Sequence, residues 1–319
     1  MKDAPVIALG IDVGGTKTAL GVVRFPAGEI VAEKTIPTLP SRSSEIVLED
    51  IVAAAGELTA KAHQTGDEVS CVGVGICELI DPYGEILSHS CLTWNKGQVQ
   101  DRLAHLGPVT LEADVRAAAR AEALFGSGRP FRIFLYVTVG TGIACSLVIE
   151  KAPHVGSRGA TGTIASSPMN WACENCGHID NQSLEEIASG PALVKRLNRL
   201  HSGTVNSSEE VFAAAAAGND DAKSIIRSAG YVLGSTVALM INMLDPEAVI
   251  VGGGLGLSEG PFWSSFIDST RKHIWSDVHR DLPILQAATG TRAGMIGAAI
   301  SARKVAAPGR SFNDGSRTG

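Results

Sequence analysis

One short motif constrains the fold of this chain more than any other feature. It follows the apolar run Val6 to Leu9 and reads Ile11-Asp12-Val13-Gly14-Gly15-Thr16-Lys17-Thr18. A strand that ends in an aspartate and a Gly-Gly-Thr turn presents backbone N–H groups, a hydroxyl and a carboxylate at one point, which suits a polyphosphate and its metal ion. A tight hairpin between two apolar runs would use the same residues. The motif alone leaves both interpretations open.

The composition favours small-molecule chemistry. The chain has 319 residues, 45% of them hydrophobic, which is enough for two ordinary domains. Its net charge of -6 argues against general binding to nucleic acid or to an anionic membrane, because both need clustered lysine and arginine. No signal peptide and no apolar run near membrane-spanning length is recognised, so we expect a cytoplasmic protein. The six cysteines are too scattered for a disulfide framework.

A strand–turn–strand pattern occurs twice. The first copy joins strands at Val6-Leu9 and Thr18-Val23, and the second joins Arg132-Val139 to Ile143-Ile149 through Gly140-Thr141-Gly142. This repetition predicts two related halves, each with one phosphate-facing hairpin. Between the copies we expect a strand at Ile30-Ile36, a helix at Ser44 to Lys61, strands at Val69-Ile76 and Val109-Leu111, and a helix from Val115.

The second half of the chain is predicted to be mainly helical after an irregular region from Pro153 to Ser183. Helices run to Leu200, and a long Ala-rich helical stretch extends from Glu209 to Met243. The strand Ala248-Val251 then ends in Gly252-Gly253-Gly254, where a nucleotide could approach the backbone closely. A final helix is expected at Ala293 to Lys304, and the tail 307–319 is expected to be disordered.

Five motifs together resemble those of the ROK sugar kinases in order and spacing, from about Ile7 to Ala299. The resemblance implies an α/β, two-domain actin-like ATPase (ribonuclease-H-like) fold with an interdomain cleft. It places an N-terminal domain at 1–115, completed by a C-terminal helix at about 293–305, and a C-terminal domain at 116–292. The motifs are Asp12-Val13-Gly14-Gly15-Thr16-Lys17, Glu112-Ala113-Asp114, Val139-Gly140-Thr141-Gly142, Leu184-Glu185-Glu186-Ile187-Ala188-Ser189-Gly190 and Asp245-Pro246-Glu247-Ala248-Val249-Ile250-Val251-Gly252-Gly253-Gly254.

The resemblance also implies an activity, the phosphorylation of a hexose hydroxyl by ATP and Mg²⁺. Asp114 matches the catalytic base of the family, and Asp12 is the candidate acid on the metal side, acting on Mg²⁺ indirectly. Family members usually form homodimers. The residues implied to contact the nucleotide are Asp12, Gly14, Gly15, Thr16, Lys17, Gly140, Thr141, Gly142, Gly252, Gly253 and Gly254.

The chemistry of the reaction supports the role of Asp114 independently. A sugar hydroxyl is a poor nucleophile, so a carboxylate must accept its proton as the new P–O bond forms. Val109-Leu111 delivers Asp114 to the carboxyl end of a strand, where ligand-contacting residues collect in α/β sheets. The alternatives are that Asp114 only caps the helix that follows and that Asp12 is an ordinary turn carboxylate.

The expected sugar pocket departs from the family pattern. Thr163 and Ser166 stand where the family has a glutamate and a histidine, Ala113 replaces an asparagine, and Cys77-Glu78 replaces Pro-Gly. Losing partners for specific hydroxyls changes which acceptor is bound. We therefore expect an aminosugar or cyclitol acceptor rather than glucose, although Glu78 could also be a solvated loop residue. The candidate substrate-binding residues are Glu78, Glu112, Asp114, Thr163 and Glu185.

The zinc motif of the family is also altered. Cys173, Cys176 and His178 remain, and a tetrahedral zinc site would need a fourth donor. A loop that lost its metal is the favoured interpretation, so structural zinc is doubtful.

Two other functions stay open for this fold. A catalytically silent sugar- or nucleotide-binding regulator would explain the altered pocket, and a hydrolase would use water as the acceptor. A DNA-binding repressor is not expected, because no helix-turn-helix precedes the first strand. Retention of Asp12, Asp114 and both Gly/Thr turns favours the kinase.

Overall fold

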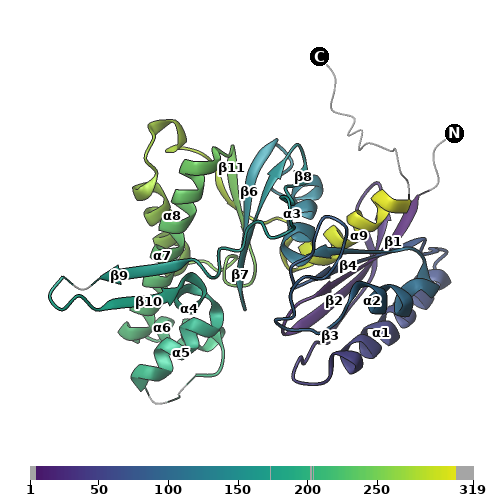
Figure 1. Cartoon of the computed structure of the whole chain (residues 1–319), viewed down its shortest axis with the longest axis horizontal. Coiled ribbons are helices and arrows are strands. Elements are labelled where there is room, and N and C mark those ends of the chain that lie inside the picture. The colour runs from purple at the N-terminus through teal and green to yellow at the C-terminus, as the bar shows by residue number, and fades with distance from the viewer. Residues whose placement is uncertain (1–4, 173, 202, 204, 307–319) are drawn as a thin grey trace. The chain divides into compact units, whose positions relative to one another are not determined.

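The computed structural model consists of two units, each with its own sheet and hydrophobic core (Figure 1). Unit 1 comprises Met1–Ala121 and Arg292–Gly319, and unit 2 comprises Glu122–Thr291. The structure describes residues 5–172, 174–201, 203 and 205–306. The predicted tail, 307–319, therefore lies outside the described residues.

The sheet of unit 1 has the strand order β3-β2-β1-β4-β5. The first three strands are antiparallel neighbours, and β4 and β5 extend the sheet in parallel with β1. Parallel strands end at the same edge of a sheet, so residues that follow β1, β4 and β5 come together. The five strands are β1 (Val6–Val13), β2 (Lys17–Phe25), β3 (Glu29–Pro37), β4 (Cys71–Ile76) and β5 (Val109–Ala113).

The sheet of unit 2 repeats this plan. Its order is β12-β11-β6-β7-β8, with β6, β7 and β8 antiparallel and β11 and β12 parallel to β6. The repetition predicted from the two strand–turn–strand patterns is confirmed, and it extends over all five strands of each sheet. These strands are β6 (Ile133–Val139), β7 (Ile143–Ile149), β8 (Ala152–Pro153), β11 (Ala248–Gly252) and β12 (Ile284–Gln286).

The C-terminal helix α9 (Ala293–Ala306) lies on the sheet of unit 1, against β1, β4 and β5. Its backbone approaches two strands at glycines: a Cβ on Gly10 would lie 1.8 Å from the Met295 carbonyl oxygen, and one on Gly73 would lie 1.8 Å from that of Ala298. No other residue fits at such distances, because a Cβ would overlap the helix backbone. The two glycines therefore allow α9 to cover this face of the sheet.

The other helices of unit 1 are set by local signals. Ser43 caps the first turn of α1 (Ser44–Gln64) by accepting a hydrogen bond from the Ile46 N–H, which confirms the helix predicted from Ser44. The short helix α2 (Lys96–Leu103) was not predicted, although Asn95 and Gln98 form a capping box there. The helix α3 (Asp114–Phe125) begins one residue earlier than expected, at Asp114 itself.

One helical prediction for unit 2 was wrong in its extent. The stretch predicted from Glu209 to Met243 is two helices, because Gly218 takes a left-handed φ of 101° and Asn219 caps a new helix by accepting from the Ala222 N–H. The helices of unit 2 include α4 (Leu184–Ala188), α5 (Gly190–His201), α6 (Ser208–Ala216), α7 (Asp220–Leu244) and α8 (Pro261–His273).

Four further elements of unit 2 were not predicted. The region expected to be irregular contains an antiparallel pair, β9 (Pro168–Ala172) and β10 (Ile179–Ser183). Helix α8 begins at Pro261, and β12 is only three residues long. The three strands are too short for periodicity to identify them, whereas the buried Phe262 and Phe266 of α8 have helical spacing that was overlooked.

Helix α7 corrects the expectation about membrane spans. By length and composition it could cross a membrane, with a mean hydropathy of 1.4 over its best window. Of that window, 56% is buried inside unit 2, where α7 packs against α8. It is therefore a core helix, and its buried residues form part of the hydrophobic core of unit 2.

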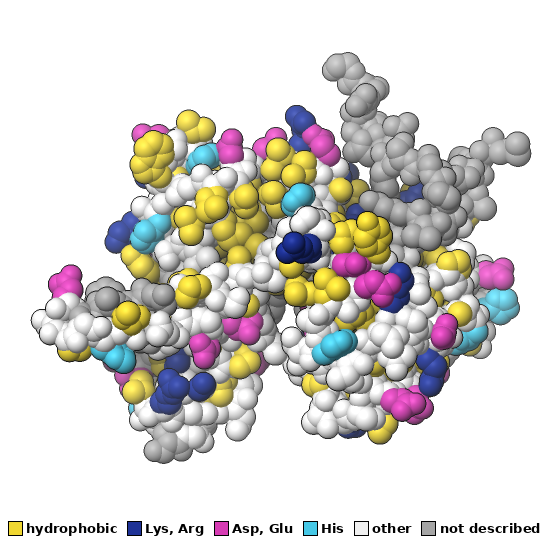
Figure 2. All heavy atoms as spheres, in the orientation of Figure 1, with side chains coloured by type: hydrophobic (Ala, Val, Ile, Leu, Met, Phe, Trp, Pro, Cys, Tyr) yellow, Lys and Arg dark blue, Asp and Glu magenta, His cyan; other side chains and the backbone are white. Residues whose placement is uncertain are grey.

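The surface in Figure 2 carries charges of both signs. On that face of the described chain, lysine and arginine side chains lie singly or in small groups between acidic ones. Exposed ion pairs of the described chain include Arg292 with Glu33 and Arg132 with Glu150. Such exposed pairs contribute little stability.

A buried carboxylate joins the two segments of unit 2 that lie next to its connections with unit 1. Glu122, with no exposed surface, accepts hydrogen bonds from the N–H groups of Ser127, Ala288 and Thr289 and from the Thr289 hydroxyl. The chain crosses between the units at residues 121–122 and 291–292. Glu122 thus fixes both connections to each other.

Candidate functional site

The register of the parallel strands brings two predicted acids together in unit 1. Asp12 on β1 pairs with Gly75 on β4, which pairs with Glu112 on β5. A Cβ on Gly75 would lie 3.6 Å from the Asp114 Cα. Asp12 and Asp114 therefore lie at one edge of the sheet, on either side of a glycine whose missing side chain leaves the space between them open.

The Gly14–Lys17 segment joins β1 and β2 as a tight turn. The Gly14 N–H donates to the Lys17 carbonyl oxygen at 3.1 Å, and Thr16 and Lys17 are exposed. The hairpin interpretation of this motif is confirmed. It does not exclude the other one, because a hairpin at the sheet edge can still offer its groups to a phosphate. The phosphate-binding role of Gly14, Gly15, Thr16 and Lys17 stays a prediction.

Burial raises the pKa of Asp12 to about 7, from an ordinary value of 3.8. The negative charge of Asp114 also contributes to this increase, and the positive charge of Lys17 opposes it. A carboxylate held in this way gains from a nearby cation, because the cation stabilises the ionised form.

The pKa of Asp114 is raised to about 6, again chiefly by burial. A hydrogen bond from the Val115 N–H and the charge of Arg116 lower it, and the charge of Glu78 raises it. Asp114 Oδ1 accepts from Val115 at 2.6 Å rather than from the second or third N–H of the helix, so its contact differs from that of an ordinary N-cap. A carboxyl group with this pKa is ionised at neutral pH and basic enough to accept a proton.

Glu112 is held by two arginines of α3. Its Oε1 accepts from Arg116 Nε at 2.6 Å, and its Oε2 accepts from Arg120 Nη2 at 3.1 Å. Arg116 is buried and also donates to the Ile80 carbonyl oxygen at 2.6 Å. Both oxygens of Glu112 therefore have a protein partner, and any contact with a substrate would have to share them. The predicted substrate contact of Glu112 is not tested.

Glu78 is not a solvated loop residue, since it is only 5% exposed. Its Oε1 accepts from the N–H groups of Cys91 at 2.6 Å and Leu92 at 3.1 Å, and its Oε2 accepts from the Ser90 N–H at 2.9 Å and from the Ser88 hydroxyl. Burial alone would raise the pKa of Glu78, but these hydrogen bonds outweigh it and lower the pKa. The carboxylate thus holds segment 88–92, and neither of the two interpretations from the sequence included this role.

In unit 2 the corresponding turn lies against Glu185. The Ile143 N–H donates to Glu185 Oε2 at 2.9 Å, and a Cβ on Gly142 would lie 2.9 Å from the same oxygen. The Gly140 carbonyl oxygen accepts from the Gly190 N–H at 2.8 Å, so the start of α5 also contacts this turn. Glu185 lies in the first turn of α4, and it also lies beside the predicted phosphate-facing turn.

The triple-glycine run packs against the same end of β6. The Val139 carbonyl oxygen accepts from the N–H groups of Leu255 and Gly256 at 3.0 and 3.1 Å. Gly253 has a φ of 80°, and a Cβ there would lie 2.3 Å from that oxygen, so only glycine fits. Residues 140–142 and 252–254, predicted from separate motifs, therefore come together within unit 2.

Two predicted groups contribute less to this arrangement. Thr163 is exposed, and its hydroxyl donates to the Ala160 carbonyl oxygen at 3.4 Å. Cys176 and His178 are exposed, whereas Cys173 lies outside the described residues. Among residues that are described, no group of three or more His, Cys, Asp or Glu side chains could hold a metal ion. Structural zinc stays an untested prediction.

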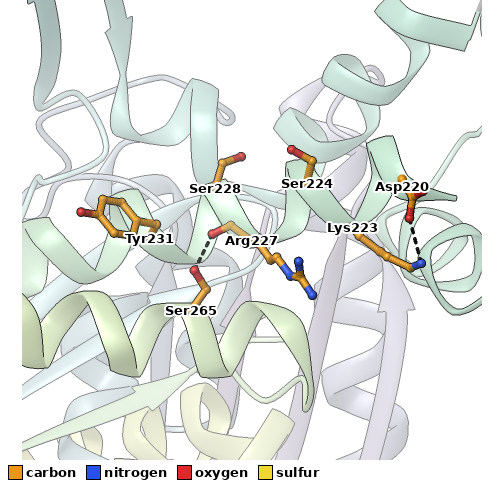
Figure 3. Close-up of a pocket in the computed structure, with 7 residues that line it drawn as sticks. All are labelled: Asp220, Lys223, Ser224, Arg227, Ser228, Tyr231 and Ser265. Carbon is orange, nitrogen blue, oxygen red and sulfur yellow. Dashed lines mark hydrogen bonds and ion pairs between the residues drawn. The ribbon is translucent and has the colours of Figure 1, made fainter. Parts of the chain in front are cut away.

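A pocket opens between α7 and α8 of unit 2, and it contains none of the predicted site residues (Figure 3). Two of its polar side chains have partners within the pocket: Lys223 pairs with Asp220 at 3.0 Å, and the Ser265 hydroxyl donates to the Arg227 carbonyl oxygen at 2.7 Å. We assign no chemistry to it. Its lining residues are Asp220, Lys223, Ser224, Arg227, Ser228, Tyr231 and Ser265.

The repeated sheet order, with a glycine–threonine turn and acidic residues at the strand ends, defines an actin-like ATPase fold of two α/β units. The family model described as "ROK family" matches residues 8–305. The chain therefore belongs to the ROK family.

Individual relatives agree with this assignment. A glucokinase from Streptomyces coelicolor is 29% identical over 93% of this chain and 98% of its own length. An N-acetylmannosamine kinase from Vibrio vulnificus is 29% identical over 79% of this chain and 84% of its own. A crystal structure of a ROK family glucokinase from Streptomyces griseus, in complex with glucose and AMPPNP, is similar with a TM-score of 0.78 and 27% identity, covering 93% of this chain and 99% of that one. The predicted family and fold class are confirmed.

Sequence reasoning missed one residue beside Asp12. Gly294, at the start of α9, lies so close that a Cβ there would be 2.1 Å from Asp12 Oδ2. The two residues are far apart in the sequence, and no local pattern connects them. Only the position of α9 on the sheet reveals the contact.

We predict that Gly294→Ala displaces the Asp12 carboxylate and lowers kcat/KM about 100-fold, because a misplacement of about 1 Å at a reacting centre has effects of that size. Steady-state kinetics checks this. Gly56→Ala in α1 is the matched control, since a Cβ at Gly56 meets nothing within 4 Å. The control should keep its activity and gain up to about 1 kcal/mol of stability. Equal kinetics for the two variants would contradict the positioning role of Gly294.

We also predict the pH dependence of turnover. Asp114 must be ionised to accept a proton, and its pKa is about 6. Below that pH, kcat/KM should fall about tenfold per unit, with an acid limb near pH 6 rather than near 4. Asp12 and Asp114 interact, so the measured value belongs to the pair. A profile of kcat/KM at constant ionic strength checks this, and a flat profile from pH 5 to 8 would contradict it.

Proposed function

We propose that this protein is an ATP-dependent kinase that phosphorylates a hydroxyl of a hexose-like acceptor. The observation that carries the proposal is the Asp114 carboxyl group, held at the sheet edge beside Asp12 with a pKa of about 6. The ROK relatives named above support it, because they include a glucokinase and an N-acetylmannosamine kinase. Binding alone would not require a proton acceptor at this place.

The reaction transfers one phosphoryl group. The acceptor hydroxyl oxygen attacks the γ-phosphorus of ATP, Asp114 takes the hydroxyl proton as the P–O bond forms, and ADP leaves with the electrons of the broken bond. The Gly15 N–H and the Thr16 hydroxyl would bind phosphate oxygens, whereas the Gly14 N–H closes the turn by donating to the Lys17 carbonyl oxygen. The turns at 140–142 and 252–254 would contact the nucleotide, which can approach their glycine backbone closely.

The donor set of unit 1 fits Mg²⁺. The ion usually binds one or two carboxylates together with substrate phosphates and water, and Asp12 offers a carboxylate oxygen whose ionisation a cation would favour. When bound, Mg²⁺ would neutralise charge on the phosphoryl group being transferred. Asp12 would hold it indirectly or through one oxygen, beside the Gly14–Thr16 turn.

The acceptor we propose is an aminosugar or cyclitol rather than glucose. Glu78 does not support this proposal, because its carboxylate is hydrogen-bonded to segment 88–92. The remaining support comes from Ala113, Thr163 and Ser166, which remove hydrogen-bonding groups present in the family motifs. We further propose that the protein works in the cytoplasm as a homodimer, which light scattering of the purified protein would check.

We predict that Asp114→Asn lowers acceptor-dependent ADP formation by a factor of 100 to 10,000, roughly the contribution of a general base. Nucleotide binding should persist, and stability at pH 8 should not fall, because the variant removes a charge whose burial is unfavourable. A coupled ADP assay and thermal melts check this. Undiminished turnover in the variant would refute the role of Asp114, and ADP release that ignores the acceptor would indicate a hydrolase.

We predict a kcat/KM at least tenfold higher for an aminohexose, an N-acylated aminohexose or a cyclitol than for glucose, measured on a panel of these acceptors. Thr163→Glu restores a carboxylate of the family motif at an exposed position and should raise the relative use of glucose. Thr163→Gln is the neutral control of similar size. A clear preference of the unmodified protein for glucose would refute this acceptor class, and no phosphorylation of any acceptor would favour the regulator.

A further inference from the structure

Two cysteine side chains of unit 1 lie near each other beside the proposed site. Cys77 follows β4 directly, and Cys91 belongs to the segment 88–92. Both are free thiols, and Cys91 is close enough to Cys77 to raise the pKa of its thiol. The proposed kinase chemistry uses neither of them.

The proximity of the two thiols is maintained by the residue next to Cys77. Glu78 accepts hydrogen bonds from the backbone N–H groups of Ser90, Cys91 and Leu92, so it fixes the backbone of Cys91 at three points. Because residues 77 and 78 are adjacent, the same carboxylate holds Cys91 opposite Cys77. The pair is thus part of a hydrogen-bonded loop and not a chance approach of two flexible side chains.

The two thiols differ in access. Cys91 is exposed, whereas Cys77 is partly covered. Burial, the charge of Asp114 and the neighbouring thiol all raise the pKa of Cys77. Because Cys91 is exposed, an oxidant from solution meets it first. The raised pKa keeps Cys77 protonated, so Cys77 attacks the oxidised Cys91 more slowly than an ordinary thiol would.

The pair also lies between the two parts of the proposed site in unit 1. The Cys77 N–H donates to the Val13 carbonyl oxygen at 3.1 Å, directly before the Gly14–Thr16 turn. The Cys91 Sγ lies 3.8 Å from the place where a Cβ on Gly15 would be, and the charge of Asp114 acts on Cys77. A covalent change at the thiols would therefore alter the surroundings of both the turn and the base.

We propose that Cys77 and Cys91 are a site of reversible oxidation, whose disulfide inhibits the kinase. Hydrogen peroxide oxidises the Cys91 thiol to a sulfenic acid and is reduced to water. The Cys77 sulfur then attacks the Cys91 sulfur, the S–S bond forms, and the sulfenic oxygen leaves as a second water with the Cys77 proton. A disulfide needs an S–S distance of about 2.05 Å, which draws Cys91 toward β4 and changes its packing on Gly15. A dithiol reductant reverses the step.

The inhibitory part of this inference rests on the proposed function, and the disulfide itself does not. The test therefore has two readouts on the full chain. Protein reduced with dithiothreitol is freed of reductant and treated with hydrogen peroxide, and non-reducing peptide mass spectrometry locates any linkage. Acceptor-dependent ADP formation is measured before treatment, after it, and after renewed reduction.

We expect a Cys77–Cys91 linkage, a loss of kcat/KM of at least tenfold, and recovery on reduction. Cys91→Ser should form no linkage and keep its activity in peroxide, whereas Cys176→Ser, which changes an exposed cysteine of unit 2, should respond as the unmodified protein does. Glu78→Gln should slow formation of the linkage several-fold, because an amide cannot accept all the hydrogen bonds that hold segment 88–92.

Three outcomes would overturn the inference: no linkage while other thiols are oxidised, a linkage that leaves kcat/KM unchanged, or equal inactivation of Cys91→Ser. If the reduced protein phosphorylates no acceptor, the proposed function fails separately. Calorimetry of ATP binding by the reduced and the linked protein then provides the second readout, and equal affinities would overturn the inhibitory effect.

Discussion

The close contact of α9 with the sheet of unit 1 is the constraint on which the proposed site depends. Gly10 and Gly73 allow the helix backbone to lie directly on β1 and β4. That depth of packing brings Gly294 against the half-buried Asp12 carboxylate. Burial is the main cause of the raised pKa of both Asp12 and Asp114. The chemistry proposed for the acids therefore follows from a packing contact made by residues near the C-terminus.

The same burial has a thermodynamic cost at neutral pH. Both folded-state pKa values lie above the ordinary aspartate value of 3.8, so the folded chain binds protons more tightly than the unfolded chain does. The resulting stability is fully present below about pH 3.8 and is lost as the pH rises through about 6 and 7. Near neutral pH the acids therefore reduce the stability of the folded state, as is common where a protein keeps reactive groups ready.

Much of the fold could be predicted from the sequence, because strands with long apolar runs and helices with clear caps carry local signals. The first hairpin illustrates the limit of such signals: Gly14 and Gly15 indicated either a turn or a phosphate site, and the turn is confirmed at the very edge where a phosphate could bind. Short elements were missed, such as β9, β10 and β12, and the break at Gly218 between α6 and α7 was misjudged.

Only the acidic residues and the glycines of the candidate site could be predicted from the sequence. Motif order identified Asp12 and Asp114, and the strand register brings them together. The hydrogen bonds of Glu78, the arginine partners of Glu112 and the contact of Gly294 could not be predicted, because each depends on where a side chain points or on residues distant in sequence. Tertiary packing determines which side chains are the partners of a buried charge, so local patterns in a single sequence do not reveal them.

The assignment of residues 292–319 to unit 1 has a consequence for synthesis on the ribosome. Unit 2 is a continuous stretch of chain, so it can fold as soon as it has emerged. The sheet of unit 1 is translated before unit 2, and α9 (Ala293–Ala306) is translated after it, so the sheet lacks this cover while unit 2 is made. Nascent unit 1 thus exposes an unfinished core during that time, the condition in which molecular chaperones engage a chain.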